Sequence, residues 1–541
     1  MAEEASTTRR RQPGRGAVWA RRAFGALTGL LAGYTALAVA ELVAAFGRVE
    51  SGPVIAVGSA AIDRTPPPVK DWAIRHFGTN DKLVLQLGIL AALVVLALAL
   101  GLFALSHRRA GSAGVLLFGV VGAGAALSRP DSVGVSDAMP SVVGAVAGAA
   151  VMYVLAGRLR VAPSAAAPAA EAGEDGRPRW DRRGFLVVAG ATAVATTGVG
   201  VLGRSLGGNL GQDAVASRDA VRLPAPASPA RKVPTGARLR IPGISPFTTP
   251  NGHFYRVDTA LVVPKVDARS WRLRIHGKGV KRPLSLSFDD LLRRELIERD
   301  VTLTCVSNEV GGPYVGNARW TGVRLATLLE ECGVRPPSKG GPADQLVSRS
   351  VDGMTIGTPV EDVMDGRDAL LAVGMNGQPL PFVHGFPVRM VVPGLYGYVS
   401  ACKWLKDIEL TTFDSYDPYW VKRGWARRAP IKTESRIDTP KPFARPKSGT
   451  VTVAGVAWAQ HRGVRKVEVR VDDGAWHEAD LAAQDTVDTW RQWFYRWDAT
   501  PGGHTLTVRA TDGTGRVQTD RRTRTIPDGA SGRHSVVVTV D

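Results

Sequence analysis

The residue whose type and position best suit chemistry is Cys305, in the run VTLTCVSNEVGG. Val301, Leu303 and Cys305 alternate, so they share one face of an expected strand that ends where the polar, glycine-containing run begins. A thiol at the end of a strand can reach a site built from loops. The same local pattern also fits a small buried core residue, which is a common environment for a free cysteine.

The remaining cysteines and the histidines carry weaker signals. Cys332 belongs to VRLATLLEECGV, where the apolar positions fall at i, i+3, i+4 and i+7 of a helix, so Cys332 is predicted to pack in the core. Three cysteines without a CxxC exclude a disulfide scaffold, and the chain has neither a CxxCH haem motif nor a cysteine cluster for an iron–sulfur centre. By local pattern alone, His384 is a turn residue before Gly385 and Arg389 is a surface charge on a strand.

The elements that must position these residues divide the second half of the chain in two. From about 237 to 415, β-branched runs at 261–264, 300–305, 387–393 and 407–413 alternate with helical patterns, as in a mixed α+β domain. From about 430 the pattern changes. Alternating valines at 467–471, the turn DDG and Trp476 predict a hairpin, and further strands are expected at 489–499, 504–510 and 535–541. This spacing predicts an antiparallel sandwich of immunoglobulin-like shape, without the cysteine pair of antibody domains.

Length and charge bound the alternatives. A chain of 541 residues is expected to form three or four units. The net charge of +19 raises the possibility of nucleic-acid binding, yet much of the excess lies in segments that flank apolar runs, and no arm, finger or RNP motif is present. We therefore expect no nucleic-acid partner. The excess on 204–541 is better explained as steering of an anionic substrate or an acidic redox partner.

The first third of the chain predicts a membrane region. Stretches at 23–46, 83–105, 111–128 and 139–157 are each close to the ~20 residues that cross a bilayer. Arginines in the tail 1–22, between the second and third stretches and after the fourth place these segments in the cytoplasm. None of the histidines lies within a span, so a haem between the helices has no evident ligand. Glu41, near the outer end of the first span, is expected to snorkel.

The segment 180–203 contains a fifth apolar stretch, and it differs from the others because Arg182 and Arg183 immediately precede that stretch. It resembles a twin-arginine export signal, and the alternative is an ordinary fifth helix that obeys the positive-inside rule. Ala214, Val215 and Ala216 could form a cleavage site, although we favour an uncleaved chain. Five spans that start inside end outside, which predicts an extracytoplasmic location for 204–541. The Gly, Ala and Pro-rich segment 204–236 is expected to be a linker.

Across roughly 245–541 the sequence resembles the sulfite oxidase family of molybdenum enzymes. Five motifs in family order carry this resemblance: FYRVDTALVVP, LTCVSNEVGG, GNARWTGVRLATLLEECG, MNGQPLPFVHGFPVRMVVPGLYG and CKWL. The resemblance implies a molybdopterin oxidoreductase domain at 237–425, and a sandwich of the family's dimerisation type at 426–541, which leaves a homodimer open. The membrane region is then 23–203.

The resemblance also implies a molybdenum–molybdopterin cofactor, with Cys305 as the protein ligand of the metal, a role that suits a soft thiolate. Arg389 matches the family's phosphate-side position, for which planar arginine is well suited. Arg256 has two implied roles, as a cofactor contact and as a catalytic residue that faces the substrate. The remaining implied cofactor contacts are Phe254, Tyr255, Asn308, Ser350, His384, Ser400 and Lys403.

The departures from the family pattern concern the substrate. Where sulfite oxidases carry arginines after the cysteine motif this chain has Glu309 and Val310, and it has Asp352 at the position of an active-site tyrosine. The expected pocket therefore has less positive charge than that of sulfite oxidases, which disfavours binding of a sulfite dianion. The family also includes exported methionine sulfoxide reductases, and a neutral sulfoxide would tolerate such a pocket better.

Both substrates imply two-electron oxygen-atom transfer on a small sulfur compound. With neither haem nor an iron–sulfur cluster expected in this chain, the electrons would pass to or from an external redox protein or a quinone-linked membrane partner. The alternative from another class is a catalytically inactive surface module: an anchored sandwich on a degenerate cofactor domain. Metal content distinguishes the two.

Overall fold

The computed structural model describes residues 15–66, 69, 72, 76–77, 81–129, 132–160 and 181–541. The predicted basic tail up to residue 14, and the arginines at 177 and 179, lie outside these residues. The chain divides into two compact units, unit 1 (Met1–Gln212) and unit 2 (Asp213–Asp541). The expected linker at 204–236 is wrong as drawn, because the last helix of the first region continues without a break to Ala220.

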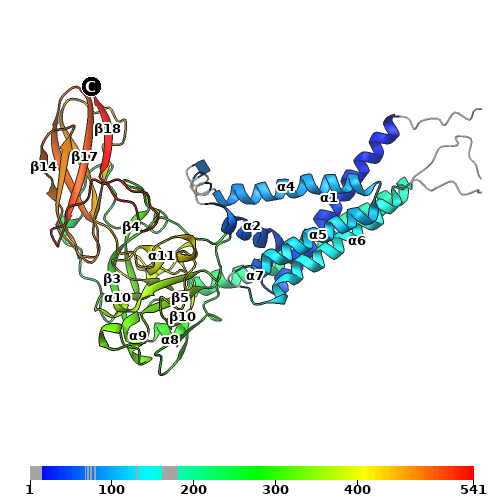
Figure 1. Cartoon of the computed structure of the whole chain (residues 1–541), viewed down its shortest axis with the longest axis horizontal. Helices are drawn as coiled ribbons and strands as arrows, with labels where there is room; N and C mark the ends of the chain where they lie inside the picture. Colours follow the sequence, from blue (N-terminus) through cyan, green and yellow to red (C-terminus); the bar gives the residue numbers. More distant parts are fainter. Residues whose placement is uncertain are drawn as a thin grey trace, which may run out of the picture. The chain divides into compact units, whose positions relative to one another are not determined.

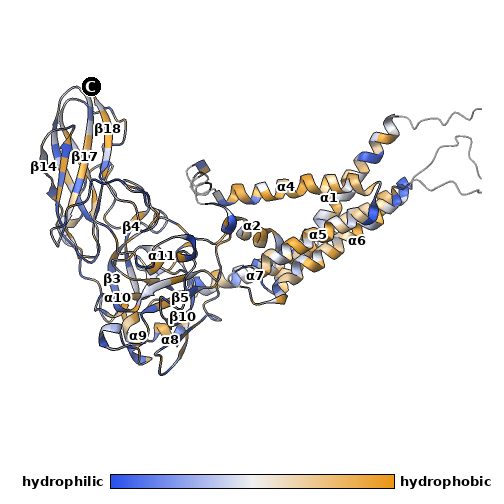
Figure 2. Ribbon diagram, in the orientation of Figure 1, coloured by the Kyte–Doolittle hydropathy of each residue, from blue (hydrophilic) through white to orange (hydrophobic). Residues whose placement is uncertain are grey.

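Unit 1 is built from helices (Figure 1). Five of the helices in the described residues are long and apolar enough to span a membrane, by length and composition. Figure 2 shows hydrophobic residues over most of their length. The helices are α1 (Arg15–Phe46), the shorter α2 (Pro53–Arg64), α4 (Asp81–Ala104), α5 (Arg108–Leu127), α6 (Met139–Arg158) and α7 (Arg182–Ala220).

Small residues let these helices approach closely. A Cβ atom built on Gly29 of α1 would lie 1.8 Å from the Ala97 carbonyl oxygen of α4, and one on Gly144 of α6 would lie 2.3 Å from the Ala36 oxygen of α1. Backbone approach of this kind is a common basis of helix association in lipid. Glu41 is half-exposed and lies 3.7 Å from Arg204 of α7, so this carboxylate has an ion-pair partner within unit 1.

Helix α7 begins before the unit boundary and ends within unit 2. The Asp181 carboxylate accepts a hydrogen bond from the Gly184 amide at its start (2.8 Å). Near its end, Arg218 donates to the carbonyl oxygens of Leu380 and Pro379, and the Ala268 amide donates to Ser217. These contacts with distant segments explain the helical extension, since the Gly and Ala-rich sequence there has no apolar periodicity of its own.

A mixed sheet, an antiparallel sheet and short helices form the first part of unit 2. One sheet has the order β2-β1-β10-β5-β6, and the other the order β3-β4-β7-β8 with β9 paired to β7. Residues 261–264, expected to be a strand, have no ladder partner: Leu261 is buried by packing, while Val262 is exposed and Pro264 lacks an amide proton. The strands are β1 (Arg272–Gly277), β2 (Leu284–Ser287), β3 (Leu296–Thr304), β4 (Val315–Arg324), β5 (Gln345–Ser350), β6 (Thr355–Pro359), β7 (Leu370–Met375), β8 (Gln378–Pro379), β9 (Arg389–Val391) and β10 (Leu405–Thr411).

The short helices complete this α+β domain and cover its core. Ser287 caps α8 through a capping box with Asp290. Cys332, just after α9, has no exposed surface, which confirms its predicted place in the core. The helices are α8 (Phe288–Leu292), α9 (Leu325–Glu331), α10 (Val360–Met364) and α11 (Gly397–Ser400), together with the 3₁₀ turns η6 (Phe382–His384) and η7 (Val421–Arg423).

The second part of unit 2 consists of two four-stranded antiparallel sheets that enclose a common core. The predicted hairpin is present, because β13 pairs with β14 across the turn after Val471. The identification of this sandwich with the immunoglobulin-like shape stays a prediction. One sheet contains β11 (Glu434–Thr439), β12 (Gly449–Trp458), β16 (Arg491–Ala499) and β15 (Asp480–Leu481), and the other contains β14 (Trp476–Glu478), β13 (Val464–Val471), β17 (Gly502–Asp512) and β18 (His534–Val540).

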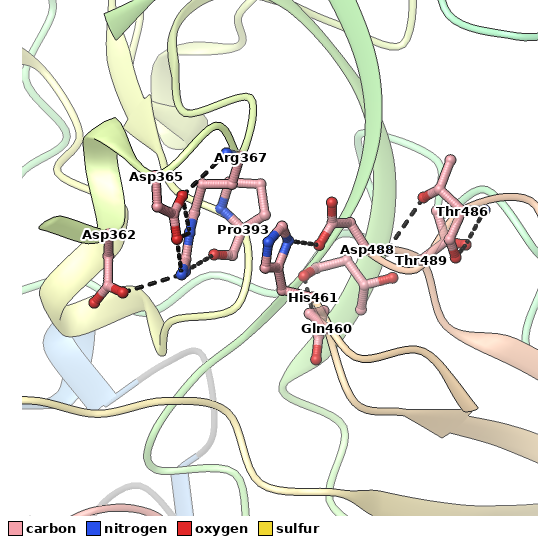
Figure 3. A network of polar contacts seen from close by, with 10 residues as sticks. Asp362, Asp365, Arg367, Pro393, Gln460, His461, Thr486, Asp488 and Thr489 are labelled. Carbon is pink, nitrogen blue, oxygen red and sulfur yellow. Dashed lines mark hydrogen bonds and ion pairs between the residues drawn. The ribbon is translucent and has the colours of Figure 1, made fainter. Parts of the chain in front are cut away.

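The sandwich holds the strand that leads to Cys305. The Gln460 side-chain amide donates to the Thr302 carbonyl oxygen (2.9 Å) and to Thr304 Oγ1 (3.1 Å). The Trp490 backbone amide donates to Thr302 Oγ1 (2.7 Å). Figure 3 shows a network of polar contacts that includes Gln460. In it His461 pairs with Asp488, and Arg367 pairs with Asp362 and Asp365 and donates to the Pro393 carbonyl oxygen. The core of the α+β domain continues into Val456, Trp458 and Trp490 of the sandwich.

Replacing Gln460 with leucine is expected to weaken this connection. The variant leaves a buried carbonyl oxygen and a buried hydroxyl of β3 without their donor, which costs about 1–3 kcal/mol of unfolding free energy. Denaturant unfolding of the purified full-length chain, followed by tryptophan fluorescence, measures the change. Gln484→Leu, at an exposed position of the same domain, is the matched control, and equal stabilities of the two variants would contradict the prediction.

The contact between His534 and the loop after Cys305 predicts a pH dependence of stability. His534 Nδ1 accepts the Ile437 amide proton (3.0 Å), and its ring packs so tightly against Gly311 that a Cβ atom there would lie 2.1 Å from it. Burial, and secondarily Arg436, lowers the pKa of His534 to about 4, below its ordinary value of 6.5. Between these pH values the unfolded state binds more protons, so stability is full above pH 6.5 and is lost as the pH falls toward 4.

The loss attributable to His534 is at most about 3 kcal/mol, at ~1.4 kcal/mol per pKa unit. Urea unfolding at a series of pH values checks this, with His534→Gln as the comparison, because glutamine cannot titrate there. The variant should show a flatter pH dependence between pH 6.5 and 4, and an unchanged slope would show that other groups dominate.

Candidate active site

A pocket in unit 2 opens where the loops of the α+β domain converge. It encloses about 800 Å³ of empty space including its open mouth. Its walls come from the loop before β1, the end of β3, β6 and the turn before it, η6, β9, α11 and the segment around η7. The lining residues are Phe254, Tyr255, Val257, Asp258, Thr259, Cys305, Val306, Ser307, Met354, Ile356, His384, Arg389, Gly397, Tyr398, Ala401, Lys403, Trp420 and Trp425.

Cys305 lies at the end of β3 and lines the pocket, as its alternating pattern predicts. Its amide donates to the Tyr314 carbonyl oxygen (2.9 Å), and its carbonyl oxygen accepts from the Asn308 amide (3.0 Å). The Asn308 side chain accepts the Tyr314 amide proton (2.8 Å), which closes the loop after the cysteine. The thiol is thus held by backbone geometry on both sides.

The thiol is protonated unless a positive partner binds it. Burial raises the pKa of Cys305 above its ordinary value of 9.0, and hydrogen bonding with Ser307, whose Oγ lies 2.9 Å from Sγ, only partly offsets this. A bound metal ion would deprotonate such a thiol. The site therefore suits a metal ligand better than a free nucleophile.

Aromatic residues build one wall of the pocket. The rings of Phe254 and Tyr255 stack with centroids 5.1 Å apart, and Phe254 meets Trp320 edge to face at 5.8 Å. Phe254 also contacts the His384 ring at 5.5 Å. Burial holds the pKa of Tyr255 well above its ordinary value of 10.0, so its phenol stays neutral and can donate a hydrogen bond.

His384 and Arg389 come together through a close turn. Gly385 adopts a φ of +106°, and a Cβ atom there would lie 3.0 Å from the Lys403 backbone. His384 Nε2 lies 2.9 Å from the Asn251 carbonyl oxygen, to which it donates, and burial lowers its pKa to about 4. Arg389 packs over the Trp320 ring (4.8 Å) and donates to the His384 carbonyl oxygen (3.2 Å). Burial lowers the pKa of Arg389 to about 10, which leaves it cationic at neutral pH.

Asp258, a buried carboxylate, connects two further cations, Lys403 and Arg256. It is not among the site residues predicted from the sequence. The Asp258 side chain is 1% exposed, and its Oδ2 lies 2.9 Å from Lys403 Nζ and 3.0 Å from Arg256 Nε. Lys403 is 8% exposed and lines the pocket, whereas Arg256 is 36% exposed and is absent from the pocket lining. The only available sequence signal for Asp258 was its place two residues after Arg256 in the first cofactor-contacting motif.

The structure brings six of the predicted site residues to the pocket lining: Phe254, Tyr255, Cys305, His384, Arg389 and Lys403. Asn308, Ser350 and Ser400 are buried behind it, and Ser400 donates to backbone oxygens of the preceding turn. Sequence reasoning missed Met354, Tyr398, Trp420 and Trp425. The two tryptophans stand out in the segment YWVKRGW, but nothing local relates them to Cys305.

The residues present fit the cofactor implied by the sequence. Among the described residues, three of the ten predicted site residues have buried polar atoms without a hydrogen-bond partner: Asn308 Nδ2, Ser350 Oγ and Arg389 Nε. Two of these three are obligate donors, and buried donors without partners are uncommon unless a bound group satisfies them. An anionic phosphate would satisfy Arg389, and Cys305 would supply a thiolate ligand to a metal.

Comparisons with known proteins agree with this geometry. Residues 260–420 match the family described as "Oxidoreductase molybdopterin binding domain". Mitochondrial sulfite oxidase of Mus musculus is 33% identical over 288 residues, which cover 46% of this chain and 52% of that protein. Sulfite oxidase of Gallus gallus is 32% identical, with coverage of 51% and 68%. The uncharacterized oxidoreductase YuiH of Bacillus subtilis (strain 168) is 33% identical, with coverage of 30% and 75%.

A solved structure, the sulfane dehydrogenase SoxCD from Paracoccus pantotrophus, is 25% identical with a TM-score of 0.47, and the match covers 55% of this chain and 84% of that chain. The chain spans about half the length of the mouse sulfite oxidase that it matches. The chicken enzyme, however, is matched over 68% of its length. The match to the chicken enzyme, together with the molybdopterin-domain match around the pocket that contains Cys305, places the chain in the sulfite oxidase family of molybdopterin-dependent oxidoreductases.

Proposed function

We propose that this chain is a membrane-anchored, outward-facing oxidoreductase that transfers an oxygen atom to or from a small sulfur compound. The observation that carries the proposal is the position of Cys305 in one pocket with Arg389, Lys403 and His384. The proposed cofactor is molybdenum–molybdopterin, with Cys305 as ligand of the metal and Arg389 on the phosphate side. When bound, this group supplies two-electron oxygen-atom exchange.

The chain's own residues would bind and orient the reactants. The Tyr255 phenol, which burial keeps neutral, is a hydrogen-bond donor to a substrate oxygen. His384 stays neutral and fixed by Asn251. The balanced reactions are SO₃²⁻ + H₂O → SO₄²⁻ + 2H⁺ + 2e⁻ for sulfite and R₂SO + 2H⁺ + 2e⁻ → R₂S + H₂O for a sulfoxide. The electrons are exchanged singly with an external redox protein or a quinone-linked membrane partner.

The five apolar helices and the arginine-rich segments between them support anchoring and an extracytoplasmic catalytic unit. A homodimer through the sandwich stays an alternative to a monomer. The three cysteines of the chain support an external partner, since they cannot supply both a molybdenum ligand and a cysteine-ligated iron–sulfur cluster.

The test is elemental analysis for molybdenum, with pterin fluorescence, on the full-length chain purified in detergent. We expect about one molybdenum per chain, followed by turnover of sulfite or of organic sulfoxides with artificial electron carriers. A folded chain free of both metal and pterin would favour the inactive surface module instead.

A further inference from the structure

Three buried side chains of the sandwich have polar atoms that the protein leaves without a partner. Within the part of the chain that the structure describes, Glu434 Oε1, Trp458 Nε1 and Gln460 Oε1 make no hydrogen bond. Each of these residues is at most 3% exposed. Glu434 and Trp458 lie directly opposite each other in the ladder of β11 and β12, and Gln460 follows Trp458 by two positions. We call these three residues the polar seam.

One end of the polar seam reaches the strand that leads to Cys305. Trp458 packs in the core of the α+β domain, so it faces that domain. Gln460, which Figure 3 includes, donates to Thr304 Oγ1 (3.1 Å). Thr304 directly precedes Cys305, whose thiol lines the pocket. The polar seam therefore begins one residue from the pocket.

Tyr396 lies between the polar seam and the pocket. It is 1% exposed and directly precedes Gly397, which lines the pocket. Burial, and next Glu434, raise the pKa of Tyr396 well above its ordinary value of 10.0, and Cys305 adds to this effect. The phenol therefore keeps its proton, and it lies within electrostatic reach of both the Glu434 carboxyl and the Cys305 thiol.

The other end of the polar seam reaches solvent. The backbone amide of Lys432, two residues before Glu434, donates to Tyr396 Oη (3.5 Å). The Lys432 ammonium pairs with Asp528 (3.0 Å), whose side chain is 50% exposed, and it donates to the Gly529 carbonyl oxygen (2.7 Å). Polar groups thus continue from the buried Glu434 carboxyl to an exposed carboxylate.

The Glu434 carboxyl is protonated at neutral pH. Burial raises its pKa from 4.5 to about 8, and the cations Lys432 and Arg522 offset only part of that effect. A protonated carboxyl can donate as well as accept a hydrogen bond. Buried polar atoms without protein partners are usually satisfied by internal water molecules. The Trp458 donor and the Gln460 acceptor beside this carboxyl suit such waters.

The pocket's own groups are poorly suited to carry protons at neutral pH. Burial lowers the pKa of His384 to about 4 and holds the pKa of Tyr255 well above its ordinary value of 10.0. Lys403 and Asp258 form an ion pair. An efficient proton carrier has a pKa near the working pH. Each of the proposed reactions nevertheless exchanges two protons per turnover, so the protons must come from elsewhere.

Resting on the proposed function, we propose that the polar seam is a proton path between the pocket and solvent, and that Glu434 carries protons along it. In sulfoxide reduction the Glu434 O–H bond breaks, and the proton passes through internal waters and the Tyr396 phenol to the substrate oxygen. A proton from solvent beside Asp528 then re-forms the O–H bond. Two such steps supply the two protons of one turnover, and sulfite oxidation uses the path in reverse.

The first test is independent of turnover. Infrared difference spectroscopy of the full-length holoenzyme in detergent follows the C=O stretch of protonated carboxyls. Wild type should lose one such band as the pH rises through about 8, and the band should shift in D₂O because its proton exchanges with solvent. Glu434→Gln should lack this band. The control Glu468→Gln removes a buried carboxylate that Arg509 holds ionised, and it should leave the band unchanged.

The second test is turnover, with ferricyanide for sulfite or reduced benzyl viologen for a sulfoxide, whichever substrate wild type accepts. Glu434→Gln keeps the shape and the neutral charge of the protonated acid but cannot release a proton. We expect kcat to fall by about a hundredfold with KM within about twofold. The solvent deuterium isotope effect on kcat should increase, and Glu434→Asp should restore part of the rate.

Two tryptophans provide a matched pair for the internal waters. Trp458 and Trp493 are both fully buried and both have an unpartnered Nε1, but Trp493 packs in the core of the sandwich instead of that of the α+β domain. Trp458→Phe removes a donor from the polar seam, so it should lower kcat and increase the isotope effect. Trp493→Phe should change neither.

An infrared spectrum that Glu434→Gln leaves unchanged would overturn the inference, as would wild-type kcat and isotope effect in that variant. Equal losses in Trp458→Phe and Trp493→Phe would assign the effect to packing and would also overturn it. If the molybdenum-loaded wild type turns over neither substrate, the proposed function fails, while the infrared test still decides whether Glu434 exchanges a proton with solvent.

Discussion

We expect that replacing Cys305 with serine abolishes the proposed oxygen-atom transfer while leaving the fold intact. Serine has nearly the volume of cysteine, can keep the hydrogen bond to Ser307 and leaves the backbone bonds to Tyr314 and Asn308 in place. It replaces a soft thiolate with a hard hydroxyl, which changes the type of ligand that the site offers a metal. We expect a loss of rate on the order of a thousandfold or more, equivalent to about 4 kcal/mol of transition-state stabilisation.

The measurement combines turnover with pterin content and circular dichroism of the purified variant. Pterin should remain, because Arg389 and Lys403 are unchanged. Cys332→Ala is the matched control, since this cysteine is fully buried away from the pocket lining. That variant should lose some stability and keep its metal and its rate. A Cys305→Ser enzyme within about tenfold of the wild-type rate would contradict the assignment of Cys305 as metal ligand.

The second large effect concerns export. Changing Arg182 and Arg183 to lysine together should strand unit 2 on the cytoplasmic side. The change keeps both positive charges at the start of α7, so the charge rule for orientation is still satisfied. Only recognition of a twin arginine is lost. The physical reason for such a route is that a cofactor inserted in the cytoplasm requires the domain to cross the membrane folded.

Protease accessibility of unit 2 in intact cells without a cell wall measures the result. The control changes Arg158 and Arg160, at the end of α6, to lysine by the same chemistry. It should leave export normal, although Arg158 then loses its bond to Asp181 (2.8 Å). Normal export of the Arg182 and Arg183 variant would identify α7 as an ordinary spanning helix.

Local sequence patterns determined much of this architecture. Apolar runs of spanning length predicted the helices of unit 1, and alternating valines predicted the hairpin of β13 and β14, because both signals repeat within a few residues along one element. Cys332 was assigned to the core by helical spacing alone, and it is fully buried. Cys305 was correctly placed at a strand end for the same reason, although its role came from the family resemblance.

The tertiary structure decided what depends on contacts between distant segments. Asp258 and Lys403 are separated by 145 positions, and no local period relates them. The extension of α7 to Ala220 depends on hydrogen bonds from Arg218 to residues 379 and 380. The hydrogen bond that attaches β3 to the sandwich joins Thr302 to Gln460, 158 positions later. Each of these pairings is set by how two elements pack. The sequence therefore determined the elements and the place of Cys305 at a strand end, while packing between distant segments determined which charged side chains lie near it.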